Sequence, residues 1–222
     1  MSTENKTKKP MGATDCTTPI FRASYLNAFE ARAADPAKPN DKNYGVEMWF
    51  RVAEACDDRL KDQPVVKIDD LVKAANAAAA EKWGVDTTKW PKGLKGPFKK
   101  GEELTGKNGT LAGGVVVRTS RKESFGRPVV VDQNVKDIID KTQVYSGCYM
   151  LGKIHAYAWE HPTGGKGVSF TLDMLQLYRD GEPLGNAMKA EDAFAAIPVP
   201  AGAAAKPAET VPAAGGAFGA LG

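Results

Sequence analysis

The sequence predicts a mainly β domain with one or two helices, an α+β fold. Five segments have the alternating pattern or the β-branched composition of strands. One Ala-rich segment, 66–84, lies between the second and third of them and has the composition of a helix. The five strand-like segments are 19–31, 44–52, 113–121, 144–159 and 167–181.

The first three segments differ in how clearly they alternate. PIFRASYLNAFEA and YGVEMWFRV alternate throughout, and in the second Phe50 faces the core while Trp49 and Arg51 share the opposite side. GGVVVRTSR is short and β-branched, a composition that favours a strand.

The last two segments are the longest. In 144–159 the even-numbered residues are small or apolar and form a core face, whereas the odd-numbered ones include the large aromatics together with Lys153 and His155. In 167–181 the apolar phase shifts after Asp173, which predicts a β-bulge or a sharp bend there.

The remaining folded segments are assigned to helices and a loop. Segment 66–84 has acidic residues near its start and Gly84 past its end, which predicts helix boundaries. A shorter helix is expected over 133–141. The tract 89–114 is rich in Gly, Pro and Lys and is expected to be a long loop.

Composition divides the chain into three parts. Residues 1–17 are polar and are expected to form a flexible arm, and residues 18–197 to fold. Residues 198–222 are almost entirely Ala, Pro and Gly, so we expect a disordered tail. The first residues have no apolar stretch of a signal peptide, and no run is long enough to span a bilayer. The three cysteines are widely spaced without a CxxC pair, which favours a reducing, cytoplasmic compartment.

Five strands with a helix between the second and third are typical of a small closed or partly open barrel. The OB-fold is a five-stranded barrel of this kind, and it commonly binds oligonucleotides. A β-sandwich is also compatible with the pattern.

Motifs of catalysis or nucleotide binding are weak. GCYMLGKI, 147–154, has the spacing of a P-loop, but Ile154 stands where Ser or Thr is needed, and strand alternation runs straight through it. HPTGGKGVSF, 161–170, is better explained as a hairpin turn with Lys166 in it. Paired acids do not converge with a third ligand, so we expect no metal, no cofactor and no enzymatic activity.

Basic residues are concentrated and mixed with aromatic ones. Ten basic and three acidic residues lie between Lys89 and Arg127, in a chain whose formal net charge is only +3. Single-stranded nucleic acid is held by this combination, because cations track the phosphates and exposed rings stack on the bases. The candidate nucleic-acid-binding residues are Trp49, Arg51, Lys99, Lys100, Arg118, Arg121, Lys122, Phe125, Arg127, Tyr145, Tyr149, Lys153, Tyr157 and Trp159.

Two other classes of function stay open on the residues alone. One is a structural or assembly protein, a β-barrel whose aromatic face is an oligomer interface. The other is an enzyme such as a metal-dependent nuclease, which needs clustered carboxylates that the sequence does not offer.

The chain resembles the phage-type single-stranded DNA-binding proteins, a family first catalogued as a domain of unknown function. The matching stretches are FRASYLNAFEA, GRPVVVDQNVKDIIDKTQVYSGCYMLGKIHAYAWE and KGVSFTLDMLQLYRDGEPLG. The resemblance implies an OB-fold that coats single-stranded DNA without sequence preference during phage DNA replication or recombination, in the host cytoplasm. Homo-oligomerisation is a further possibility.

The C-terminal tail departs from the family pattern. Proteins of this role often end in an acidic tail with a terminal aromatic residue that recruits partners. Here Glu209 is the only acid of residues 198–222, and the chain ends with Phe218 and Leu221 close to its terminus. Recruitment of replication proteins would therefore rest on apolar residues.

Overall fold

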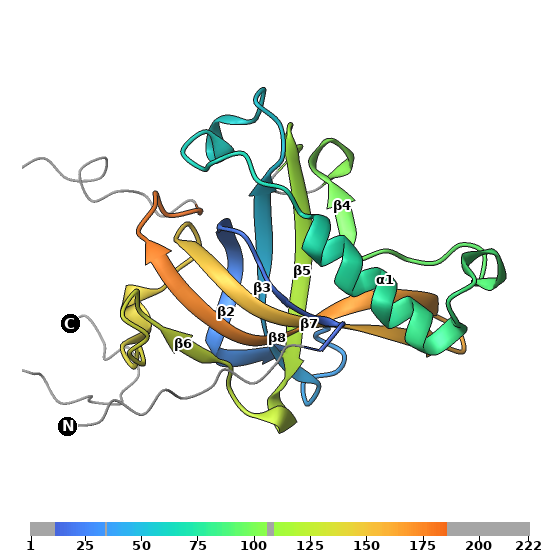
Figure 1. The fold of residues 1–222 in the computed structure, drawn as a ribbon. Helices are drawn as coiled ribbons and strands as arrows, with labels where there is room; N and C mark the ends of the chain where they lie inside the picture. Colours follow the sequence, from blue (N-terminus) through green and yellow to red (C-terminus); the bar gives the residue numbers. More distant parts are fainter. Residues whose placement is uncertain (1–11, 34, 106–108, 186–222) are drawn as a thin grey trace, which may run out of the picture. The chain divides into compact units, whose positions relative to one another are not determined.

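The structure, a computed structural model, describes residues 12–33, 35–105 and 109–185. Within these residues it consists of an eight-stranded sheet, one α-helix and several short 3-10 turns (Figure 1). The strands are β1 (Asp15–Thr17), β2 (Phe21–Ala33), β3 (Lys42–Arg51), β4 (Phe98–Lys100), β5 (Gly114–Lys122), β6 (Val129–Val131), β7 (Tyr149–His161) and β8 (Gly165–Arg179). The prediction of a mainly β, α+β fold is confirmed. None of the described residues forms a helix long and apolar enough to cross a membrane.

The five long strands coincide with the five predicted segments, whereas three short strands had no signal. β1, β4 and β6 have three residues each, too few for a period of two to be read. β1 pairs with β7, so residues 15–17 belong to the sheet and not to a flexible arm. Residues 1–11 of that arm and the predicted tail, 198–222, lie outside the described residues.

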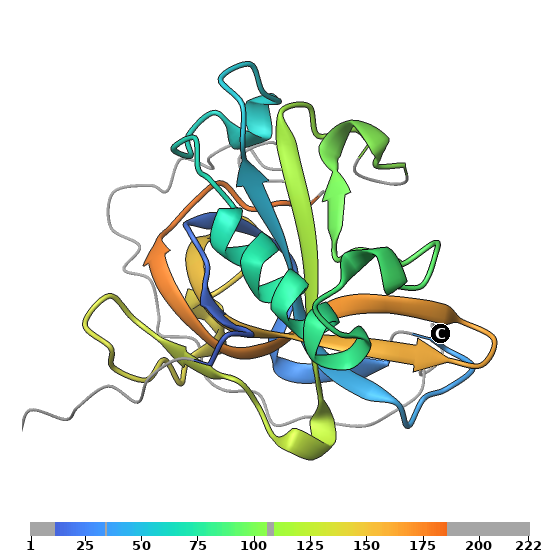
Figure 2. The same ribbon diagram turned by 45° about the vertical axis from the view of Figure 1, so that its right-hand side comes forward.

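The five long strands form a closed circuit of pairings. β2 pairs with β3 and β3 with β5, both antiparallel, and β5 pairs with β8 in parallel. β8 pairs with β7, and β7 returns to β2, both antiparallel. Figures 1 and 2 show this circuit from two sides, with β6 added at the end of β8. The sheet therefore has three strands more than the five predicted.

The tract predicted as a loop, 89–114, contributes one of these strands. β5 and β8 pair only at Thr119 with Phe170 and at Ser120 with Thr171, and β4 pairs with β5 further along. Just before β4, the carbonyl of Lys95 accepts a 3.0 Å hydrogen bond from the Val168 amide. The tract thus connects β5 to β8 where those two strands diverge.

Helix α1 (Asp69–Trp83) confirms the Ala-rich helix, including its end at Gly84, where φ is +86°. Its buried residues recur at helical spacing and join the same hydrophobic core as the strands (Figure 2). They are Leu71, Ala74, Ala75, Ala78 and Ala79. The helix packs on β1, β7 and β8.

The second predicted helix, 133–141, is wrong. A carboxylate oxygen of Asp132 accepts hydrogen bonds from the amides of Asn134 and Lys136, at 2.8 and 2.9 Å. Val135 has φ +61°, which ends any right-handed helix, and the Ile138 amide bonds to the carbonyl of Val130. Local capping by Asp132 therefore forms a turn against β6.

Two bulges direct side chains near the site described below. The predicted bulge at Asp173 is confirmed, since Lys153 faces Met174 while Ile154 faces Leu172. A second bulge lies in β2, where the partners of Ser24 and Asn27 are Glu47 and Gly45. The interpretation of 147–154 as strand rather than P-loop is confirmed over β7, which forms a hairpin with β8.

Candidate nucleic-acid interface

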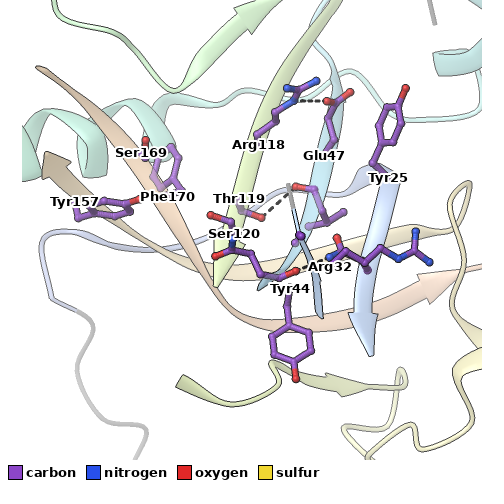
Figure 3. A pocket seen from close by; sticks show the side chains of 15 residues that line it. Tyr25, Arg32, Tyr44, Glu47, Arg118, Thr119, Ser120, Tyr157, Ser169 and Phe170 are labelled. Atoms are coloured by element: carbon purple, nitrogen blue, oxygen red, sulfur yellow. Dashed lines mark hydrogen bonds and ion pairs between the residues drawn. The ribbon is translucent and has the colours of Figure 1, made fainter. Parts of the chain in front are cut away.

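A groove of about 570 Å³ lies between the β2–β3 arm and the strands β5, β7 and β8 (Figure 3). The β2–β3 arm is the part of these two strands that includes Arg32 and Tyr44. The floor of the groove is formed by β3 and β5. Its lining includes Tyr25, Arg32, Tyr44, Glu47, Arg118, Ser120, Tyr157 and Ser169.

A second hollow of about 450 Å³ continues the groove along β5. Asn43, Ser120 and Tyr157 line both. Beyond them, the second hollow is lined by Arg121, Lys122, Phe125, His155 and Thr171. The two hollows therefore adjoin, and together they define one path along β5 from Arg118 to Phe125.

Arg118 is fixed at one end of this path by an ion pair. Its Nε donates a 2.6 Å hydrogen bond to Glu47 on the neighbouring strand, and its side chain is 67% exposed. Glu47 is buried, and its other carboxylate oxygen accepts a 2.8 Å bond from Nε1 of Trp49. The terminal nitrogens of Arg118 bond to none of the described residues, so they are available to an anion.

The other end of the path carries an exposed ring and an exposed cation. Phe125 is 67% exposed and Tyr157 is 40% exposed. The Lys122 ammonium is exposed and lies 4.0 Å from Asp41. Exposed rings that lie beside cations suit stacked bases and phosphates.

Arg121 lines the second hollow, but its guanidinium is bound to the turn that bears Phe125. Its guanidinium donates to the carbonyls of Phe125 and Gly126, at 2.8 and 2.9 Å, and lies 3.4 Å from Asp173. The other oxygen of Asp173 is 3.0 Å from Nδ1 of His155. These contacts hold the 3-10 turn Glu123–Phe125 against the sheet.

Trp49 and Tyr149 face away from the main core, as their strand positions predict, but the expectation that their rings are exposed is wrong. Trp49 is 2% exposed and packs with Leu60, Leu111 and Val116 in a second apolar cluster. Tyr149 is 1% exposed, and the guanidinium of Arg179 lies 3.7 Å from its ring centroid. The segments around Leu60 and Leu111 cover the ring of Trp49, and Arg179 of β8 covers the ring of Tyr149. A strand's period carries no information about such covers.

The cover over Trp49 is held by charged groups. The Arg59 guanidinium lies 5.4 Å from the centroid of the Trp49 ring and 2.7 Å from Asp57. The hydrogen bond from Arg59 lowers the pKa of the Asp57 carboxyl below its ordinary value. Arg59 also donates to the carbonyl of Thr110, and this bond connects the segment around Leu60 to the segment around Leu111.

Arg51 is likewise structural. Its guanidinium donates to the carbonyls of Ala53, Glu54, Lys61 and Gln63 at 2.9–3.2 Å. A guanidinium bound to four carbonyls has little left for a phosphate. The predicted contact at Arg51 is thus not supported by its surroundings.

The other candidates border the groove or lie apart from it. Trp159 donates from Nε1 to Ser169 in the groove wall at 2.9 Å, whereas the Tyr145 hydroxyl donates to the carbonyl of Gly181. The Arg127 guanidinium lies 5.0 Å from the ring centroid of Phe29. Outside both hollows are the cations Lys99, Lys100, Arg127 and Lys153.

Three aromatic or basic residues of the groove are not among the candidates from the sequence. Tyr25, Arg32 and Tyr44 line the first hollow, and Tyr25 is 57% exposed. Arg32 lies on β2 and Tyr44 on β3, outside the basic tract from Lys89 to Arg127. Tyr25 shares its strand parity with the buried Phe21, so alternation alone assigns it to the core.

Comparison with solved structures shows the same fold in phage proteins. The single-stranded DNA-binding protein from bacteriophage Enc34 in complex with ssDNA is similar with a TM-score of 0.58 at 14% identity, over 82% of this chain and all of that one. Another structure of the single-stranded DNA-binding protein from bacteriophage Enc34 gives a TM-score of 0.54 at 16% identity, over 81% of this chain and 89% of that one. For gp2.5, the single-stranded DNA-binding protein encoded by bacteriophage T7, the TM-score is 0.50 at 16% identity, over 86% and 98%.

Sequence comparison gives a curated relative and a family. Putative protein p50 of Acyrthosiphon pisum secondary endosymbiont phage 1 is 35% identical over 72 residues, 32% of this chain and 36% of that protein, so the match spans about a third of the relative's length. The model of the family described as "Enterobacter phage Enc34, ssDNA-binding protein" matches residues 14–204, which is most of the chain. The chain therefore belongs to the Enc34 single-stranded DNA-binding protein family of phages.

Proposed function

We propose that this protein coats single-stranded DNA without sequence preference, during replication or recombination of phage DNA, and that the strand lies in the groove from Arg118 to Phe125. The observation that carries the proposal is that the two hollows share lining residues and have exposed aromatic rings and cations along their combined length. Family membership supports the class of ligand.

The arrangement suits a polynucleotide because two kinds of contact alternate along it. Arg118 and Lys122 present charge to the phosphates, and each contact with a phosphate releases a counterion, so affinity falls with salt. Tyr157 and Phe125 present ring faces, which stack on any base. Neither contact distinguishes one base from another.

The fold proposed for this groove is the OB-fold barrel, formed by the circuit of β2, β3, β5, β8 and β7. Two features support it. The circuit joins five strands, with α1 between the second and third of them in the chain, and it closes through one parallel pairing, of β5 with β8. OB-folds bind oligonucleotides on their second and third strands and on the loops after the first and fourth. Here the second and third strands are β3 and β5, which line the groove together with residues of β2, β7 and β8.

The remaining proposals concern the protein's setting. A coating protein needs no catalytic group or cofactor, and it acts where phage DNA is copied, in the host cytoplasm. Contacts with replication proteins and self-association are part of the proposal, because both are common among proteins that coat DNA cooperatively.

A binding titration tests the function. Fluorescently labelled oligo-dT and a duplex of the same length are titrated with the full chain at about 20 mM and 300 mM salt, with the protein's mass in solution measured alongside. Preference for the single strand, lost at high salt, supports the proposal. Equal or absent binding at low salt contradicts it, and a stable oligomer that ignores DNA would favour an assembly protein instead.

A further inference from the structure

The backbone of Tyr25 is in an unfavourable conformation. Its φ is +47°, in the left-handed region, where a bulky side chain is a genuine outlier. Among the described residues other than glycine, Val135 alone shares a positive φ, at +61°. Left-handed backbone crowds Cβ against the carbonyl group, so both positions cost folding stability.

The bulge in β2 creates this conformation and redirects the ring. Phe21 and Ala23 point inward and are fully buried, so an unbroken strand would send Tyr25 into the core. Between Ser24 and Asn27, β2 has one residue more than β3. Ala28 is again fully buried after the bulge, and the ring of Tyr25 is left outside.

The Tyr25 side chain makes few contacts that could offset the cost of this backbone conformation. It is 57% exposed, and its hydroxyl bonds to none of the described residues. Nor does its ring stack on an aromatic or guanidinium group within the described part of the chain. Strain that packing does not repay locally is typical of functional positions.

The surroundings of the ring are those of a ligand site. Tyr25 lines the groove together with Glu47 and Arg118, and Figure 3 shows the tyrosine and the arginine on either side of the glutamate. The ring of Tyr25 therefore lies in the same groove as the guanidinium of Arg118, whose terminal nitrogens bond to none of the described residues. A base on the ring would have its phosphate close to that cation.

We infer that Tyr25 is a base-stacking residue of the groove, and that its strained backbone conformation is retained for nucleic-acid contact at the expense of stability. The inference rests on the proposed function and adds to it a stacking position that strand alternation hides. It also predicts opposite effects of one residue, because Tyr25 should strengthen DNA binding and lower folding stability.

Three substitutions in the full chain test the inference. Tyr25→Gly removes the ring and suits the left-handed backbone, Tyr25→Phe keeps the ring, and Val135→Gly relieves a comparable conformation at a position that is 72% exposed and outside the groove. Each is measured for thermal unfolding and for affinity to oligo-dT at low salt. An oligonucleotide containing 2-aminopurine reports base stacking directly through its fluorescence.

The expected results differ among the variants. Tyr25→Gly loses about 5- to 150-fold in affinity, the equivalent of one stacked base, while its Tm is unchanged or rises by up to about 4 °C. Tyr25→Phe binds as the unsubstituted chain does. Val135→Gly shows the same trend in Tm without a change in affinity, so stabilisation alone does not weaken binding.

Other outcomes overturn the inference in distinguishable ways. If the unsubstituted chain binds oligo-dT and Tyr25→Gly binds it within about twofold, the stacking role is wrong while the proposed function stands. If Tm of Tyr25→Gly falls by more than about 4 °C, the ring supports the fold and the claim of retained strain is wrong. If the unsubstituted chain does not bind oligo-dT, the proposed function fails first.

Discussion

Arg118 and Glu47 face each other on neighbouring strands, and Nε of the arginine donates a 2.6 Å hydrogen bond to the carboxylate. The buried Glu47 orients an otherwise exposed guanidinium over the groove. Arg118→Ala should therefore remove one phosphate contact. We expect weaker binding at low salt and a plot of log affinity against log salt that is shallower by about 0.7, the value per phosphate for single strands.

Arg51→Ala is the matched control for that variant. Arg51 lies on β3 in the same sheet, but its guanidinium is bound to backbone carbonyls. Its removal should lower Tm, since four backbone carbonyls lose their donor, and leave the salt slope unchanged. A shallower slope for Arg51→Ala, or an unaltered slope for Arg118→Ala, would show that the two roles are assigned wrongly.

Phe125→Ala should weaken binding without weakening the fold. The ring is 67% exposed, so little packing is lost, whereas one stacked base is worth about 1–3 kcal/mol. Tyr178→Ala serves as control, because Tyr178 is 46% exposed and lines neither hollow. Isothermal calorimetry with oligo-dT measures both, and equal losses in the two variants would contradict a stacking role specific to Phe125.

Tryptophan fluorescence should distinguish the rings at the groove from those under cover. Trp159 bonds to Ser169 in the groove wall, whereas Trp49 is buried and bonds to Glu47. We expect oligo-dT to quench emission in Trp49→Phe as in the unsubstituted chain, and to quench Trp159→Phe less. Trp49→Phe should also lose about 1–3 kcal/mol of stability, because a buried carboxylate oxygen loses its donor. Quenching that disappears with Trp49 instead would mean that its cover opens on binding.

Thiol reactivity should report the packing of the cysteines. Burial, and to a smaller extent the nearby Asp70, raises the pKa of Cys16 to about 11, and burial also raises the pKa of Cys148. The thiolate is the reactive form, so at pH 8 both should resist alkylation in the native protein. The partly exposed Cys56 should react first, and all three should react in denaturant. Mass spectrometry after brief alkylation checks this, and rapid labelling of Cys16 at pH 8 would show that its surroundings are looser than described.

Particular residues show which features of the fold are predictable from the sequence. Alternation located four of the five long strands and β-branched composition located β5, while a shift in the alternation located the bulge at Asp173. Alternation also assigned Trp49 and Tyr149 correctly to the outer side of their strands. Whether an outer side is covered depends on residues far away in the sequence, such as Leu60 over Trp49 and Arg179 over Tyr149. Local pattern does not encode such contacts.

The groove shows the same limit. Arg118, Lys122, Phe125 and Tyr157 were identified by charge and ring chemistry and do line one path. Arg121 was included for its charge alone, and only its hydrogen bonds to the Phe125 turn show another role. Tyr25 was missed because its strand parity pointed inward, and one extra residue in β2 reversed its direction.

The central claim is that single-stranded DNA lies along the groove from Arg118 to Phe125. Ultraviolet cross-linking of the full chain to oligo-dT at low salt, followed by mass spectrometry of the peptides, tests it most directly. We predict cross-links on the β7 peptide at Tyr157 and on the peptide containing Phe125, both lost at high salt, and none at Trp49 or Tyr149. Cross-links confined to α1, or to the covered face of Trp49 and Tyr149, would contradict the claim.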